Sequence, residues 1–345
     1  MQKILVAIGC LSGVIRHERK TGNYNDSQSR LIRSHVACTY TIRRNHVSNL
    51  RTVFEIKKNA LGQPSIAHIV IYNLAPDTEA QIIKEGFHIQ LEAGYAAQYG
   101  LIFDGDIIQV FRNREDGINY RLEIIAADGK SFYGGNFIRT TLAAGSKPRD
   151  VIEAAAKLAY YPIEIERVSE NLPETTLPRG KVCFGYPADI LDDQARTTDS
   201  FVQVDNGKLE VRKYTDPIPD DKCLYLTPQT GLVGTPEYTD DGIGIKMLLN
   251  PAVTIHGLIK IDNDIIQRTA VDTGQMMKPN MLPAGGKVAD QNTRFDLTGE
   301  YEVYSLVHSG DTHGETWLTE IIGIGRNGKS GLPIMVDSAD GTVRS

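Results

Sequence analysis

The sequence predicts a mainly β (α+β) protein in which two similar small β-barrel domains flank an inserted α+β module. Runs of alternating apolar and polar residues recur at short intervals from Leu50 onward, and successive side chains of a strand point to opposite faces. Helix-then-strand patterns occur twice between Ser146 and Tyr214, and strand patterns return after Thr239. Many short strands with few helices are typical of closed or half-closed barrels.

The first barrel is expected over residues 46–145. Leu50, Thr52, Phe54 and Ile56 form the more apolar side of one alternating strand. Residues 78–84 fit one or two helical turns that end at a glycine. The remaining predicted strands are residues 66–72, 87–93, 101–103, 107–111 and 120–126, with a hairpin turn at Asp116-Gly117.

The insert is expected over residues 146–238. Residues 148–159 are rich in Ala and begin with Pro, which favours a helix start, and residues 188–197 form a second predicted helix. Residues 163–168 form a strand, and the arms of a hairpin flank Asn206-Gly207, a strong signal for a two-residue turn.

The second barrel is expected over residues 239–327, followed by a tail over 328–345. Its predicted strands are residues 243–249, 258–262, 301–308 and 317–324. Residues 274–292 lack periodicity and predict a long loop, which is a common type of contact element.

Residues 1–45 form an N-terminal arm of uncertain role. The apolar residues 4–15 predict either a buried strand or an arm that packs on a neighbouring subunit. Only Lys3 precedes this run and its basic cluster follows it, which opposes a signal peptide. The run is also shorter than the ~20 residues that a membrane span needs, so no membrane anchor is expected.

Composition excludes several classes of function. The net charge of −6 opposes a dedicated DNA-binding module, because phosphate binding requires a basic surface. The four cysteines form no Cys-x-x-Cys pair, so neither a zinc site nor a disulfide scaffold is predicted. Reduced, structural thiols in a protein assembled in the cytoplasm are expected.

Residues 323–330 match the phosphate-loop pattern Gly-x4-Gly-Lys-Ser. That chemistry needs a helix immediately afterwards, and Gly331-Leu-Pro333 opposes one. The residues are interpreted as a strand end that runs into a glycine-rich tail.

Two sets of polar residues are the remaining candidates for chemistry. Asp104 and Asp106 could face one side of a strand pair as an acid–base pair, but Gly105 between them favours a turn or bulge. His308, Asp311 and His313 could imitate a metal site, but Asp311 fits better as the residue that closes a hairpin. No catalytic, cofactor-binding or metal-binding residue is therefore predicted, and the protein is not expected to be an enzyme.

Three blocks of sequence carry a resemblance to a known family: residues 51–106, residues 226–251 and the hairpin of residues 299–325. In their order and spacing the chain resembles baseplate hub proteins of contractile-tailed bacteriophages, of the Mu-like and T-even-like type. These are related to the hub part of type VI secretion spike proteins.

The resemblance implies a homotrimeric ring in the virion tail baseplate, assembled in the host cytoplasm. Two similar barrels in each of three chains would match a sixfold tail tube on one side and a threefold central spike on the other. The implied partners are the central spike protein, the tail tube and tube initiator proteins, the tape measure protein and the baseplate wedge proteins. DNA would pass through the lumen during ejection without specific binding, which suits a mildly acidic protein.

Two other interpretations stay open. The chain could be a tail-tip enzyme, either a cell-wall hydrolase or a nucleotide-binding protein that uses residues 323–330. It could also be the hub of a secretion or tailocin-type contractile device.

Overall fold

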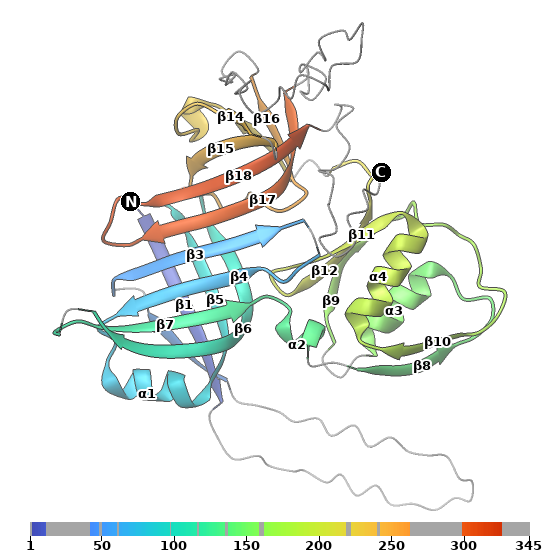
Figure 1. Cartoon of the computed structure of the whole chain (residues 1–345), viewed down its shortest axis with the longest axis horizontal. Helices are drawn as coiled ribbons and strands as arrows, with labels where there is room; N and C mark the ends of the chain where they lie inside the picture. Colours follow the sequence, from blue (N-terminus) through green and yellow to red (C-terminus); the bar gives the residue numbers. More distant parts are fainter. Residues whose placement is uncertain are drawn as a thin grey trace, which may run out of the picture.

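In the computed structural model, strands dominate and most of them belong to one 13-stranded sheet (Figure 1). The structure describes residues 2–11, 42–47, 50–60, 62–96, 98–115, 117–134, 137–158, 162–218, 222–239, 242–262 and 299–325. None of the helices among these residues combines the length and the apolar character that a membrane span would need.

The first half of the large sheet has seven strands in the order β3-β4-β7-β6-β5-β1-β2, and all neighbours are antiparallel. Their inward side chains form one core, which Ile82 of helix α1 (Pro76–Glu85) closes at one end. The alternation predicted at Thr52, Phe54 and Ile56 is confirmed, since all three side chains are buried. The strands are β1 (Gln2–Leu11), β2 (Ile42–Val47), β3 (Thr52–Asn59), β4 (Ile66–Tyr72), β5 (Gly86–Tyr95), β6 (Gln98–Arg114) and β7 (Tyr120–Ala127).

Strand β1 settles the interpretation of the N-terminal apolar run. It lies between β5 and β2, and Ile4, Val6 and Ile8 are buried in the first core of the same chain. The buried-strand interpretation is therefore confirmed for Gln2–Leu11. The alternative, an arm that packs on a neighbouring subunit, does not hold for Ile4, Val6 and Ile8, whose side chains are buried within the chain. Residues 12–15 of the predicted run lie outside the described residues.

The second half contains β14 (Glu237–Thr239), β15 (Gly242–Leu248), β18 (Trp317–Gly325) and β17 (Glu300–Asp311) as successive antiparallel neighbours. Strand β16 (Leu258–Ile261) pairs with β17, and β13 (Cys223–Leu226) pairs in parallel with β16. Leu226 lies in the core of this half, although the sequence analysis placed it in the insert. The predicted long loop, residues 274–292, lies outside the described residues.

The two halves meet at a seam where β17 pairs antiparallel with β3. Figure 1 shows the seam between the red-orange β17 and the blue β3, near the middle of the curled sheet. The prediction of a mainly β chain with an inserted α+β module is confirmed. The described strands of the two halves form one continuous sheet, and the likeness of the halves as barrels stays a prediction.

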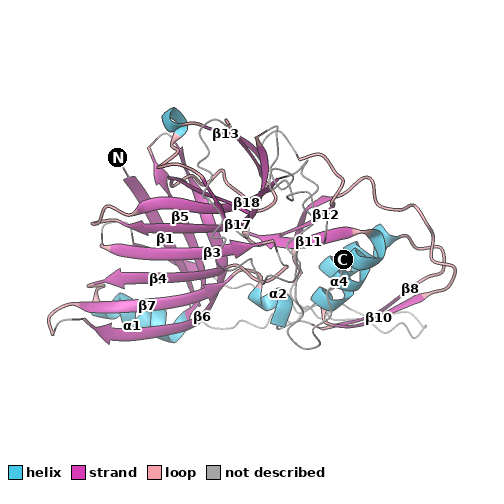
Figure 2. Cartoon of the chain, turned by 45° about the horizontal axis from the view of Figure 1, so that its top comes forward, coloured by secondary structure: helices cyan, strands magenta, loops and turns pink. Residues whose placement is uncertain are grey.

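The insert lies to one side of the large sheet and has its own core (Figures 1 and 2). Helices α3 (Pro148–Lys157) and α4 (Pro187–Thr198) pack against each other and confirm the two predicted helices. Two small sheets complete the insert, β11-β12-β9 and β10-β8. Their strands are β8 (Ile138–Leu142), β9 (Glu164–Val168), β10 (Lys181–Gly185), β11 (Ser200–Asp205) and β12 (Lys208–Lys213).

The boundary of the insert differs from the prediction. Phe132 of helix α2 (Lys130–Gly134) and Ile138 of β8 lie in the core of the insert, whereas the sequence analysis assigned residues up to 145 to the first barrel. Sequence patterns mark elements but do not show which core an element joins. Cys183 and Cys223 are both reduced in the structure, in keeping with the expected thiols.

Candidate functional site

The structure places Asp104 and Asp106 on one face of β6, where both contact His88 of β5. The Nε2 of His88 lies 2.7 Å from Asp104 Oδ1, and its Nδ1 lies 3.1 Å from Asp106 Oδ1. Burial lowers the pKa of His88, but hydrogen bonds to Asp104 and Asp106 outweigh it and raise the pKa to about 9. His88 is therefore an imidazolium held between two carboxylates. Because both ring nitrogens carry a proton, neither can act as a base or bind a metal ion.

The turn or bulge expected at Gly105 is wrong, because Gly105 lies inside the continuous 17-residue strand β6. Its lack of a side chain serves close packing instead. A Cβ atom there would lie 2.7 Å from the Phe103 ring and 2.8 Å from the carbonyl oxygen of Ala127.

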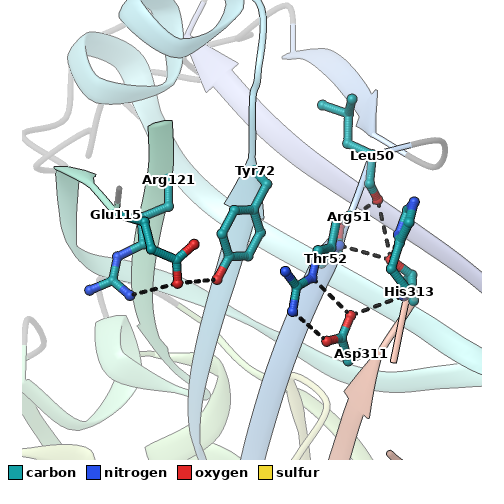
Figure 3. Close-up of polar contacts among 9 residues, drawn as sticks. Leu50, Arg51, Thr52, Tyr72, Glu115, Arg121, Asp311 and His313 are labelled. Atoms are coloured by element: carbon teal, nitrogen blue, oxygen red, sulfur yellow. Dashed lines mark hydrogen bonds and ion pairs between the residues drawn. The ribbon is translucent and has the colours of Figure 1, made fainter. Parts of the chain in front are cut away.

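Asp311 closes the turn between β17 and β18, as the sequence predicts. Its Oδ1 accepts a hydrogen bond of 2.9 Å from the backbone N–H of His313, and its Oδ2 lies 2.8 Å from Arg51 Nη2 (Figure 3). The hydrogen bond from the Arg51 guanidinium holds the pKa of Asp311 below its usual range. Arg51 also lies over the Tyr72 ring, so this turn is fixed to β3 and β4 across the seam.

His308 points in the opposite direction, into the core. It is fully buried, and its Nδ1 lies 2.9 Å from Thr319 Oγ1. Burial lowers the pKa of His308 to about 3, so the ring is neutral at ordinary pH. The structure does not bring His308, Asp311 and His313 together, and among the described residues no group of three His, Cys, Asp or Glu could hold a metal ion.

Of the phosphate-loop pattern, only Gly323, Ile324 and Gly325 lie within the described residues. They form the end of β18 and pair with β15 and β17. This is the predicted strand end, and residues 326–330 lie outside the described part of the chain.

A buried ionic cluster that was not predicted from the sequence lies where the tip of the β11–β12 hairpin meets the large sheet. The Nζ of Lys58, a β3 residue, lies 2.5 Å from Asp205 Oδ1 and 3.2 Å from Asn206 Oδ1. The backbone N–H of Gly207 donates a 3.0 Å hydrogen bond to Asp128, which follows β7. The turn of the hairpin is thus fixed to two strands of the first half.

Asp128 is almost fully buried in this cluster. Burial raises its pKa to about 7, and the nearby charge of Asp205 acts in the same direction. Lys58 and the backbone N–H groups of Asn206 and Gly207 oppose that shift. The ammonium group of Lys58 therefore lies near two carboxylates, those of Asp128 and Asp205. The Asp128 carboxyl titrates near neutral pH.

The other end of the same hairpin is fixed to the second half. Arg212 of β12 is buried, and its Nη2 donates a 3.1 Å hydrogen bond to the backbone carbonyl oxygen of His256. The His256 ring stacks on Phe201 of β11 at 3.8 Å, and its Nδ1 lies 2.8 Å from Glu302 Oε1 of β17. The β11–β12 hairpin therefore connects both halves of the sheet across the seam.

The sequence contains a signal for the junction between the β11–β12 hairpin and the large sheet. Lys58 continues the inward positions Thr52, Phe54 and Ile56 of β3, and is almost fully buried. A lysine in phase with a buried row indicates an internal ion pair, because an unpaired buried charge is costly. The sequence does not identify the partner, which is 147 residues away.

Comparisons with known proteins agree with this architecture. The crystal structure of the prophage MuSo2 43 kDa tail protein from Shewanella oneidensis has the same fold, with a TM-score of 0.52 at 9% identity over 82% of this chain and 95% of that one. A chain of the Francisella PdpA–VgrG complex in its lidded form gives a TM-score of 0.51 at 8% identity. That match covers 100% of this chain and 55% of the other, so this chain spans little more than half of that protein. No curated protein sequence matches this chain significantly.

The sequence profile of one family covers the chain from β2 to β16, which is the first half without β1, the whole insert and the start of the second half. The profile is described as Baseplate hub gp41, and it matches residues 35–267, about two thirds of the chain. Strands β17 and β18 lie beyond the matched range, although their hairpin carried part of the resemblance seen in the sequence. On this match, together with the shared fold, the chain belongs to the Baseplate hub gp41 family of phage tail proteins.

Proposed function

We propose that three copies of this chain form a ring that joins the sixfold tail tube to the threefold central spike and lets DNA pass during ejection. The observation that carries the proposal is the division of one continuous sheet into two halves, each of which has a core cluster of its own. Two such halves in each of three chains would offer six related surfaces to the tube. In such a ring the first half of one chain would contact the second half of the next.

The ring would be structural and not an enzyme, which membership in a baseplate hub family supports. Its partners would be the spike, the tube and tube initiator proteins, the tape measure protein and the wedge proteins. The β11–β12 hairpin supports this role, because a tether to both halves would keep their relative orientation fixed under load.

A density map of the assembled tail tests the proposal. We expect three copies of this chain at the junction of tube and spike, with the two halves of each chain superimposable as barrels. Six copies, a position away from that junction, or halves that do not superimpose would overturn it. The isolated protein is not a suitable sample, because the spike could be required to nucleate the ring.

The enzyme alternatives have direct tests. We expect no micromolar binding of ATP or GTP, and Lys329→Ala should change the free energy of unfolding by less than about 0.5 kcal/mol. Nucleotide binding that Lys329→Ala abolishes would establish a nucleotide site instead. Clearing of peptidoglycan in a zymogram would establish a cell-wall hydrolase. The neighbouring genes would separate a phage hub from that of a secretion or tailocin-type device.

A further inference from the structure

The outer face of the two-stranded sheet β8–β10 is an apolar surface on the side of the insert far from the seam (Figure 2). Val182 and Phe184 of β10 are 69% and 67% exposed. Phe137 packs edge-to-face on both Phe184 and Tyr186, with ring centroids 4.9 Å and 5.9 Å apart. The exposed rings thus form one cluster, and exposed apolar clusters of this kind mark interaction surfaces.

The inner face of the same sheet is already occupied. Ile138 and Cys183 point inward and lie in the core of the insert with residues of α3 and α4. Only the outer row is therefore available to a partner. Among the described residues β8 and β10 pair only with each other, so each also has an edge with unpaired backbone groups. A sheet edge of this kind can accept an extended segment of another protein.

The surface is basic in a chain that is acidic overall. The two segments that build it, residues 137–142 and 177–186, contain no Asp or Glu, whereas the whole chain has a net charge of −6. Arg139 and Arg179 are their exposed cations, whereas Lys181 lies on the inner face with Cys183 and donates a 3.1 Å hydrogen bond to Gln194 Oε1. Arg139 lies directly opposite Phe184 in the strand register, so a cation borders the aromatic cluster. Within the described residues, neither Arg139 nor Arg179 has a salt-bridge partner.

We propose that the outer face of β8–β10 binds an acidic protein of the assembled tail other than a second copy of this chain. The partner would place apolar side chains on Phe184 and Val182 and carboxylates near Arg139 and Arg179. A second copy is disfavoured because the copies of the proposed ring meet through the large sheet. This inference rests on the proposed function for the place of the chain in a tail and for the exclusion of a second copy.

A nucleic acid is the less suitable occupant. Bases stack on open aromatic faces, but Phe137 and Phe184 are packed at an interplanar angle of 88° and Phe137 and Tyr186 at 81°. Two cations, Arg139 and Arg179, are also few for a surface that follows a phosphate backbone.

Photo-crosslinking in assembled tails tests the proposal directly. A benzophenone amino acid replaces Val182, whose side chain points outward, and the crosslinked peptides are identified by mass spectrometry. We expect one tail protein other than this chain, crosslinked within a segment rich in Asp or Glu. A matched control carries the probe at Ile118, which is 82% exposed in the turn between β6 and β7, and should not give that product.

Charge and ring variants provide the second measurement. We expect Arg139→Glu and Phe184→Ser each to reduce the Val182 crosslink at least tenfold while the melting temperature of the isolated protein stays unchanged. A crosslink to a second copy or to DNA, no crosslink in tails that contain this chain, or variants that crosslink normally would each overturn the proposal. Tails that lack the chain altogether would overturn the proposed function instead.

Discussion

At the scale of single residues, the most informative feature is a pair of buried charges on strands, Lys58 and Arg212. Lys58 is buried in the inward row of β3, and Arg212 is buried where β12 meets the second half, opposite the face that Val211 turns to the core of the insert. Each contacts a group from a distant segment. Buried ion pairs contribute little net stability, because desolvation offsets their attraction. We infer that these pairs specify where the insert hairpin attaches to the sheet.

Replacing Lys58 tests this inference. Lys58→Met leaves Asp128 and Asp205 without their shared cation and should lower the free energy of unfolding by about 3–5 kcal/mol, the cost of breaking a buried pair. The adjacent Lys57→Met removes a cation that is largely exposed and paired with Glu55, so it should change stability by less than about 1 kcal/mol. Urea denaturation of both variants measures the difference, and equal losses would contradict the assignment.

Asp128 should make the free energy of unfolding depend on pH. Its pKa rises from an ordinary value of 3.8 to about 7, so the folded protein binds more protons than the unfolded chain between these values. The free energy of unfolding should therefore fall by about 3 kcal/mol between pH 5 and pH 8 through this group. Asp128→Asn removes the titration but keeps an acceptor for the Gly207 N–H.

Denaturation of both proteins at pH 5 and pH 8 separates Asp128 from all other titrating groups. We expect the wild-type protein to lose more stability over this interval than Asp128→Asn does. Parallel pH profiles would show that Asp128 does not titrate near neutrality.

At the scale of elements, the β11–β12 hairpin is the component that fixes the insert. Its turn has φ values of 51° at Asn206 and 76° at Gly207, which are the positive angles of a type I′ turn. The predicted turn is thus confirmed. The same turn carries the contacts to Lys58 and Asp128, so one backbone conformation serves both the hairpin and its attachment.

Gly207→Val should cost more than about 1 kcal/mol, because a β-branched residue resists a positive φ. A Cβ atom added at Gly207 would meet only Asp104 Cγ at 4.0 Å, so backbone strain and not a clash is the expected cause. Gly117→Val introduces similar strain at φ 80° in an exposed turn of the sheet. Hydrogen exchange should rise across residues 200–213 for Gly207→Val only.

At the scale of the whole molecule, the seam between β3 and β17 joins two cores into one body. Trp317 of β18 and Leu249, both from the second half, lie in the first core, and Trp317 packs edge-to-face on Phe54 with ring centroids 5.4 Å apart. Gly310 of β17 lies opposite both Phe54 and Trp317 in the register. The seam is therefore a packed interface as well as a hydrogen-bonded one.

Adding one methyl group at Gly310 should disrupt that interface. A Cβ there would lie 2.5 Å from the Phe54 ring and 2.7 Å from the Trp317 ring, so Gly310→Ala should cost about 1–3 kcal/mol by overpacking. Trp317 is the only tryptophan, so its fluorescence reports the seam selectively. Gly134→Ala, which has open space around its Cβ, should leave both emission and stability unchanged.

The sequence by itself determined the elements. Periodicity, the proline at the start of α3 and the Asn206-Gly207 turn act over a few residues, so they predicted most strands of the large sheet, the two helices and the hairpin. The short strands β2, β13 and β14 were not predicted. It also identified Asp311 as a turn residue and opposed a metal site at His308 and His313.

Only the tertiary structure decided how those elements combine. The pairing of β3 with β17, the union of the two halves in one sheet and the partners of Lys58, Arg212 and His88 all join segments that local patterns treat separately. Such contacts depend on which surfaces pack in three dimensions. The same alternation is compatible with many strand orders, and a buried lysine does not show which carboxylate it will meet.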